Sequence, residues 1–148
     1  MTPWTRLVAS VAVTVAVDQG TKAIITSSIG RGQSVNVFLG IDLTNVRNTG
    51  VAFGAFAGAG TPIVIVSSLA LGALLAFFAA NAATAWLWLP VGMVLGGAMA
   101  NLADRAREGA VIDFLDPVGW PAFNLADAAI VLGVLGLLYV MERPGRKR

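Results

Sequence analysis

The feature that most constrains the fold is an uncharged apolar segment at residues 61–80, TPIVIVSSLALGALLAFFAA. A helix of about 20 apolar residues is long enough to cross the hydrocarbon core of a bilayer. Pro62 fits the first turn of such a helix. The composition agrees, because 57% of the residues are hydrophobic and only 12% are charged, about half the charged fraction of a soluble domain. The sequence therefore predicts an integral membrane protein.

Three further apolar segments predict three more spans, so the expected spans cover residues 5–26, 61–80, 85–103 and 123–141. The short connection at residues 81–84 predicts that the second and third spans run antiparallel. The first apolar run also has the pattern of a secretory signal peptide. We favour a retained helix, because apolar character resumes after DQGTK. The predicted fold is one domain over residues 1–148, an all-α membrane protein with four transmembrane helices.

Residues 31–58 have a different pattern. Apolar side chains recur at every second position from Val35 to Leu43, which is typical of a β-strand, and Gly40 is the expected site of a bend or bulge. The Asn48-Thr49-Gly50 sequence predicts a turn. We expect a small strand-rich element outside the hydrocarbon core. It is too small to be stable alone and must rest on the helices or on the membrane surface.

The chain contains no cysteine and no histidine. This excludes disulfides, thiol nucleophiles, serine–histidine triads and the commonest zinc ligands. The net charge is only +2 and no basic stripe predicts binding of nucleic acid. If the protein is an enzyme, its acid and base groups are Asp, Glu, Lys or Tyr.

Three of the eight acids lie in residues 111–127, VIDFLDPVGWPAFNLAD, between two long apolar runs. The prolines and glycine in the middle predict a turn that brings Asp113 back toward Asp127. An ionisable group inside a membrane segment is a functional-site hypothesis by default, and two carboxylates flanking one turn suggest an acid/base pair that shares a proton. Alternatively, Asp127 is a charge at a helix N-terminus and Asp113 is an ordinary loop acid. Asp116 is interpreted as a solvated loop acid.

Other polar residues fall at the same membrane face, if four spans are assumed. Asp18 and Lys22 are four residues apart and can pair on one helix face, and a plain interfacial ion pair is a serious alternative to a functional role. Asn101, Asp104 and Arg105 share a face at the end of the third span. The complete set of polar residues expected at this face is Asp18, Lys22, Asn48, Asn101, Asp104, Arg105, Asp113, Asn124 and Asp127. Such convergence favours a site at the outer interface.

Orientation follows from the basic residues. The tail ERPGRKR and Arg6 favour a cytoplasmic location for both termini. Five basic residues fall on each side, so this orientation rests on the density of basic residues in the tail and on structural roles for the outer ones. We expect the polar face to be the extracytoplasmic one.

Five sequence blocks together resemble bacterial lipoprotein signal peptidase, signal peptidase II. They are DQGTK at residues 18–22, NTGVAFG at 48–54, GGAMANLADR at 96–105, VIDF at 111–114 and FNLAD at 123–127. Each block is short, but their order between four spans is specific and covers nearly the whole chain. One departure is Ala100, where the family usually has glycine before the asparagine. An added methyl at a close helix contact is expected to shift Asn101 slightly.

The resemblance implies an aspartic endopeptidase of the bacterial inner membrane. Such an enzyme removes the signal peptide from a prolipoprotein that carries diacylglycerol, cutting before the lipidated cysteine. It also implies a small extracytoplasmic β-strand cradle beside the four helices. The catalytic pair matches Asp113 and Asp127, and the residues that shape the site match Asp18, Lys22, Asn48, Asn101, Arg105 and Asn124. Arg105 is expected to be structural, paired with an acid such as Asp104 or Asp18.

On this hypothesis one aspartate is ionised and activates a water, while the other is protonated and hydrogen-bonds the scissile carbonyl. No metal or other cofactor is expected. The partners are diacylglyceryl-modified prolipoproteins and membrane lipid, with no nucleic acid, and we expect a monomer. Two other classes remain open. A proton-linked carrier predicts polar groups spaced through the membrane depth, and a structural bundle partner needs no set of motifs at one face.

Overall fold

The computed structural model describes residues 1–50 and 60–142. The described elements, in chain order, are α1 (Pro3–Ser28), β1 (Ser34–Phe38), β2 (Ile41–Asn48), α2 (Gly60–Asn81), α3 (Trp88–Glu108), β3 (Val111–Pro117) and α4 (Leu125–Glu142). Helices dominate, and a small antiparallel sheet accompanies them. The predicted combination of apolar helices with a minor strand element is confirmed.

Three of the described helices are long and apolar enough to cross a membrane, namely α1, α2 from Pro62 onward, and α4. The helix α3 has 21 residues, or about 31 Å at 1.5 Å per residue, but it is less apolar. Its last turns carry Asn101, Asp104 and three further charged side chains. Three spans of the predicted four are therefore supported by length and apolar character within the described residues.

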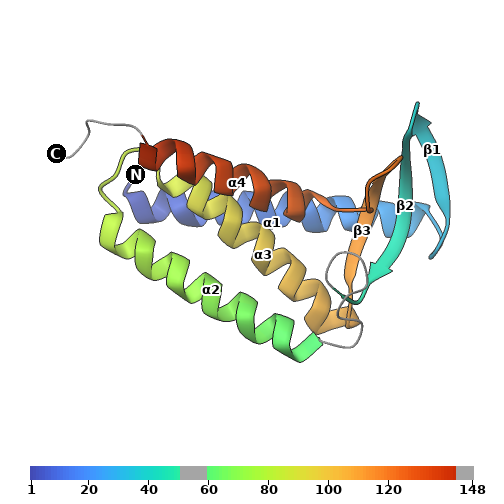
Figure 1. The fold of residues 1–148 in the computed structure, drawn as a ribbon, viewed down its shortest axis with the longest axis horizontal. Helices are drawn as coiled ribbons and strands as arrows, with labels where there is room; N and C mark the ends of the chain where they lie inside the picture. The colour runs from blue at the N-terminus through green and yellow to red at the C-terminus, as the bar shows by residue number, and fades with distance from the viewer. Residues whose placement is uncertain (51–59, 143–148) are drawn as a thin grey trace.

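The helices form a bundle in which α3 contacts each of the other three (Figure 1). The start of α1 and the end of α4 lie at one end of this bundle, and the sheet lies at the other end. The connection between α2 and α3 is at the same end as the start of α1 (Figure 1). All polar side chains of the predicted site belong to the sheet end.

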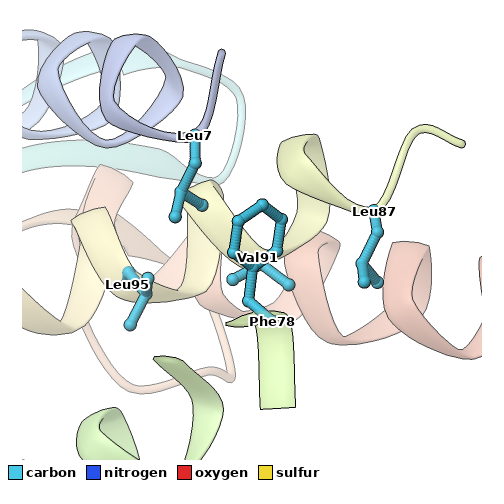
Figure 2. Packing of buried hydrophobic residues seen from close by; sticks show 5 residues of the cluster. All are labelled: Leu7, Phe78, Leu87, Val91 and Leu95. Atoms are coloured by element: carbon cyan, nitrogen blue, oxygen red, sulfur yellow. The ribbon is translucent and has the colours of Figure 1, made fainter. Parts of the chain in front are cut away.

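The apolar core of the bundle lies near the end opposite the sheet. It consists of Leu7 from α1, Phe78 from α2, Val91 and Leu95 from α3, and Leu87 just before α3 (Figure 2). All five side chains are buried, and the rings of Trp4 and Phe78 make a T-shaped contact with their centroids 5.0 Å apart. This cluster joins α1, α2 and α3 away from the polar residues.

Glycines on α3 allow close approach of its neighbours. A Cβ atom on Gly96 would lie 2.7 Å from Cβ of Thr14 on α1. A Cβ atom on Gly97 would lie 2.5 Å from the carbonyl oxygen of Ala126 on α4. Neither position has room for a larger side chain. The glycines therefore fix the separation of three helices directly beside the predicted catalytic Asp127.

The helix bounds differ from the predicted spans at α3. The helix begins at Trp88 and not at residue 85, because residues 82–87 form turns in which Trp86 has a φ of 68°. It continues to Glu108, where Gly109 adopts the left-handed conformation that ends many helices. The polar residues at its C-terminal end are thus part of a continuous helix.

The sheet has the order β1-β2-β3 with antiparallel pairing throughout. The stretch expected to be one strand with a bend is a hairpin, since Gly40 has a φ of 80° and permits a reversal there. The strand β3 was not predicted. It pairs with β2, from Ile41 opposite Pro117 to Asn48 opposite Val111. The sheet therefore combines two segments that are distant in sequence. The predicted strand region at residues 51–58 lies outside the described residues.

A second apolar cluster attaches the sheet to the helices. Ile25 and Ile29, at the end of α1, pack with Phe114 of β3, and Leu43 of β2 packs against them. The Asn45 side chain donates a hydrogen bond to the Ile29 carbonyl oxygen at 2.6 Å. Arg47 and Glu108 form an ion pair that links β2 to the end of α3. These contacts hold β3 in place over the polar ends of α1 and α3.

Candidate active site

The predicted site residues meet where β3 and the polar ends of α1, α3 and α4 come together. Asp18 and Lys22 lie on α1, Asn48 ends β2, Asn101 and Arg105 lie on α3, Asp113 lies on β3, Asn124 precedes α4, and Asp127 lies in its first turn. Seven of these eight residues belong to one connected hydrogen-bond and ion-pair network. The exception is Arg105.

Asp113 is buried in the middle of β3, where it pairs with Val46 of β2. Its Oδ1 accepts a hydrogen bond from Nδ2 of Asn124 at 2.8 Å, and its Oδ2 accepts one from Nδ2 of Asn48 at 3.0 Å. The Asn48 Oδ1 atom accepts a hydrogen bond from the backbone N–H of Gly50. Both carboxyl oxygens are therefore held by amide groups of fixed orientation.

Asp127 is held by a reciprocal cap at the start of α4. Its backbone N–H donates to Oδ1 of Asn124 at 2.9 Å, and its Oδ2 accepts from the backbone N–H of Asn124 at 3.3 Å. This is the capping-box arrangement, in which two orphan N–H groups of a helix start are satisfied by side chains. Nδ2 of Asn101 donates to Asp127 Oδ1 at 2.8 Å. The Asp127 carboxylate remains partly exposed.

Asn124 joins the two carboxylates. It is completely buried, and its Nδ2 reaches Oδ1 of Asp113 at 2.8 Å, Oδ1 of Asn101 at 3.2 Å and the carbonyl oxygen of Ile112 at 3.2 Å. Its Oδ1 and its backbone N–H serve the Asp127 cap. One side chain thus sets the relative position of the aspartate on β3 and the aspartate on α4.

A buried ion cluster lies beneath this pair. Nζ of Lys22 is 2.7 Å from Oδ2 of Asp18 and 2.6 Å from Oδ2 of Asp104, and all three side chains are almost fully buried. The ammonium group also donates to Oδ1 of Asn101 at 3.2 Å. A buried charge needs such complete pairing, because an unpaired one costs several kcal/mol.

The two acids of the cluster also hold backbone groups. Oδ1 of Asp18 accepts from the N–H of Ala126 at 2.9 Å, which caps the start of α4 next to Asp127. Oδ2 of Asp104 accepts from the N–H of Ile112 at 3.3 Å, next to Asp113. Each acid therefore anchors the neighbour of one candidate catalytic residue.

Asp104 belongs to the polar residues expected at this membrane face, but it was not among the residues predicted to shape the site. The available sequence signal was the position of Asp104 three residues after Asn101, which puts both side chains on one face of α3. Arg105 was expected to pair with Asp104 or Asp18, and this is wrong, because both acids pair with Lys22. Within the described residues the Arg105 side chain has no hydrogen bond or ion pair, and it is half-buried on the last turn of α3.

Asp116 is also placed differently from the expectation. It lies in β3 opposite Asp42 of β2 and is half-buried, so it is a strand residue and not a loop acid. It takes no part in the network around Asp113. Ala100, the departure from the usual motif, is buried, and its carbonyl oxygen accepts a hydrogen bond from Nε2 of Gln19 at 3.4 Å.

The surroundings of Asp113 favour its protonated form. Burial raises the pKa of this carboxyl group from 3.8 to about 6, and the negative charge of Asp127 acts in the same direction. The hydrogen bonds from Asn48 and Asn124 and the charge of Lys22 lower the pKa and offset part of the effect. A carboxyl group with such a pKa can both donate and accept a proton near neutral pH.

Among the described residues, no three acids are grouped in a way that could hold a metal ion. The Lys22 ammonium group occupies the space between Asp18 and Asp104. The network supplies two carboxyl groups of different environment, one buried and one partly exposed, fixed by asparagine amides. This arrangement is suited to general acid and general base chemistry on a neutral substrate.

Comparison with known proteins agrees with the geometry. Residues 10–142 match the family model described as signal peptidase (SPase) II. A lipoprotein signal peptidase of Syntrophus aciditrophicus (strain SB) is 40% identical over 142 residues, covering 88% of each chain. The lipoprotein signal peptidase of Pelotomaculum thermopropionicum is 40% identical over 133 residues, again covering 88% of each chain.

Solved structures extend the match to the fold. A bacterial membrane enzyme structure determined by the in meso method at 1.9 Å resolution superposes with a TM-score of 0.84 at 29% identity, covering 94% of each chain. A second such structure, at 2.3 Å resolution, gives a TM-score of 0.83 at 30% identity. On the matched residues, the relatives and the fold, this chain belongs to the signal peptidase II family of lipoprotein signal peptidases.

Proposed function

We propose that Asp113 and Asp127 are the catalytic pair with which this signal peptidase removes signal peptides from prolipoproteins. The observation that carries the proposal is the bridge through Asn124, which contacts the carboxyl groups of both residues. Asp113 is the buried partner with the raised pKa, and Asp127 is the more exposed partner. Asp18, Lys22, Asn48, Asn101 and Asn124 hold the pair, and Arg105 lies beside the site.

In the proposed reaction Asp127 is ionised and takes a proton from a water molecule. The water oxygen attacks the scissile carbonyl carbon, while protonated Asp113 donates its proton to the carbonyl oxygen. The tetrahedral intermediate is therefore neutral. The C–N bond then breaks, the amine leaving group takes the proton from Asp127, and Asp113 recovers its proton from the intermediate as the new carboxyl group forms. The pair keeps one shared proton through the proposed cycle.

The proposed substrate is a diacylglyceryl-modified prolipoprotein, cut before its lipidated cysteine. What supports this choice is the location of the network at the ends of apolar helices, where a lipid-anchored peptide bond is presented at the membrane surface. The sheet is proposed to act as a cradle for the peptide. Hydrolysis by two carboxyl groups needs no metal, and a monomer is sufficient because every group of the network comes from one chain.

We further propose that α3 is the fourth membrane span. It is long enough, and its lower apolar content is explained by its central place in the bundle, where α1, α2 and α4 shield it from lipid. Both termini then lie in the cytoplasm and the site faces the periplasm, in the inner membrane. The basic tail on which this orientation partly depends lies outside the described residues.

The test is cleavage of a diacylglyceryl-modified prolipoprotein by purified protein in detergent. Asp113→Asn and Asp127→Asn should each lower the rate by roughly 10²–10⁴-fold, because general acid–base catalysis contributes about that much. Asp116→Asn is the matched control, since this acid lies on the same strand outside the network, and it should keep normal activity. EDTA should leave the rate unchanged. Normal cleavage by either catalytic variant would refute the proposed pair.

A further inference from the structure

The far end of the sheet carries four large apolar side chains that face outward. Phe38 is 69% exposed, Leu39 91%, Val118 85% and Trp120 69%. We call these four residues the apolar tip. Phe38 ends β1, Leu39 lies in the turn between β1 and β2, and Val118 and Trp120 lie in the turn directly after β3. So much contiguous apolar exposure is unusual on a water-facing surface and indicates an interaction site.

The apolar tip has a defined backbone. The N–H of Val118 donates to the carbonyl oxygen of Gly40 at 2.9 Å, which ties the two turns together. Gly40 and Gly119 have φ values of 80° and 79°, so both reversals depend on glycine. The N–H of Trp120 donates to the carbonyl oxygen of Pro117 at 3.1 Å. The side chains are thus presented together on a fixed platform.

The position of the apolar tip relative to the helices identifies its partner. The hairpin of β1 and β2 lies across the sheet end of the bundle, and its tip extends beyond the edge of α4 (Figure 1). The helix α4 is apolar and long enough to cross the membrane, and its outer side chains such as Leu135 are exposed to the surroundings. A structure that projects sideways past this helix overhangs the lipid that surrounds it.

The charges near the apolar tip agree with a lipid partner. Residues 37–41 and 117–123 contain no charged side chain. The nearest acids, Asp42 and Asp116, lie opposite each other one position further along the strands. Tryptophan is the residue most typical of the membrane interface, where its ring is apolar and its N–H stays near water. On β2 and β3 the uncharged stretch therefore ends at these two acids.

We propose that the apolar tip inserts into the interfacial layer of the leaflet at the sheet end of the helices and anchors the sheet on the bilayer. The spans hold the bundle in the membrane, and the apolar tip holds the sheet at a fixed height above it. Because β3 belongs to this sheet, the anchor also sets the height of Asp113. The proposal depends on the membrane location of the helices and not on peptidase activity.

The absence of cysteine from the chain makes the test direct. Leu39→Cys and Val118→Cys each create a single site for a nitroxide label, and both positions are too exposed for the change to disturb packing. The labelled proteins are reconstituted in vesicles of phosphatidylethanolamine and phosphatidylglycerol. Collision rates of the label are then measured with oxygen, which concentrates in lipid, and with a water-soluble nickel chelate.

Two control sites calibrate the measurement. Arg31→Cys labels an exposed position before β1, away from the apolar tip, and should report water. Leu135→Cys labels the exposed surface of α4 and should report hydrocarbon. The oxygen-to-nickel ratio at Leu39 and Val118 should be severalfold above the ratio at Arg31 and below that at Leu135. A ratio equal to that of Arg31 would overturn the proposal.

A charge provides a second test. Leu39→Asp should withdraw the turn from lipid, since an ionised carboxylate is disfavoured in the membrane. The ratio measured at Val118→Cys should then fall toward that of Arg31. Low collision rates with both reagents would instead show a protein contact, such as a second copy, and would also overturn the proposal. None of these measurements depends on cleavage.

Discussion

At the scale of single residues, the site depends on amide groups and on one buried cation. Asn124 and Asn101 connect the carboxyl groups of Asp113 and Asp127 to Lys22. Amides suit this role because each offers donors and an acceptor without adding charge. The electrostatics of the site therefore depend on its few ionised side chains.

The first prediction concerns Asp104. Asp104→Ala removes a partner of Lys22 and the acceptor for the Ile112 N–H. Breaking a buried ion pair from one side typically costs roughly 3–5 kcal/mol. We expect a lower unfolding temperature in detergent, with Asp116→Ala as the control acid on β3. An equal small effect of both variants would contradict the structural role assigned to Asp104.

The second prediction concerns pH. In the proposed mechanism Asp113 acts in its protonated form, so kcat/KM should fall as the pH rises through its pKa, which burial raises to about 6. The hydrogen bond from Asn48 stabilises the ionised form and lowers the pKa. Asn48→Ala should therefore raise the pKa and move the alkaline limb of the pH–rate profile to higher pH. Asn36→Ala, which alters an exposed amide of β1, should leave the profile unchanged. A shift to lower pH for Asn48→Ala would contradict this assignment.

At the scale of elements, the site depends on how closely α3 approaches α4. The Gly97 position faces the carbonyl oxygen of Ala126, one residue before Asp127. An added side chain there cannot be accommodated by rotation of a flexible group, because the contact is with backbone. The α4 helix must move instead, and Asp127 moves with it.

Gly97→Ala is therefore predicted to impair catalysis more than stability. Overpacking costs typically about 1–3 kcal/mol, while a displacement of about 1 Å at a catalytic group can lower a rate on the order of 10²-fold. Gly72→Ala on α2 is the matched control, since a Cβ atom there meets no atom within 4 Å. Cleavage rate and unfolding temperature are measured for both variants. Equal cleavage rates for Gly97→Ala and Gly72→Ala would contradict the prediction and show that α4 tolerates the shift.

The sequence predicted the elements unevenly. The segment at residues 61–80 corresponds to α2 because a long uncharged apolar run has few alternatives in structure. The strand β3 could not be recognised, because VIDFLDP does not alternate and its first four residues are buried. Its pairing with β2 joins segments that are distant in sequence. The reversal at Gly40 was predicted only as a bend, since a pattern of period two does not distinguish one bent strand from a hairpin.

The site residues were predicted from motif resemblance more than from physical pattern. Spacing placed Asp18 with Lys22 and Asn101 with Asp104, but it could not show that Lys22 lies between Asp18 and Asp104. That contact depends on the packing of α1 against α3, which glycines make possible. The role of Asn124 as a bridge was equally inaccessible, because it needs the register of β3 and the start of α4 together.

At the scale of the whole molecule, the start of α1 and the end of α4 lie at one end and the sheet lies at the other (Figure 1). Because the chain has no cysteine, Ala83→Cys, between α2 and α3, and Arg31→Cys, before β1, create single labelling sites on opposite sides. An impermeant thiol reagent added to intact cells with a permeabilised outer membrane should label Arg31→Cys and spare Ala83→Cys. Both should react after lysis. The reverse pattern would invert the proposed orientation.

The contact between Asp18 and Ala126 joins the first helix to the last described one across 108 positions of sequence. This contact caps the start of α4 and so helps to place Asp127, which the proposed mechanism pairs with Asp113. A growing chain with only its earlier helices inserted therefore lacks a complete pair. On the proposed mechanism, a partly made copy that lacks α4 cannot cut the polypeptides inserted beside it, because Asp127 is not yet present.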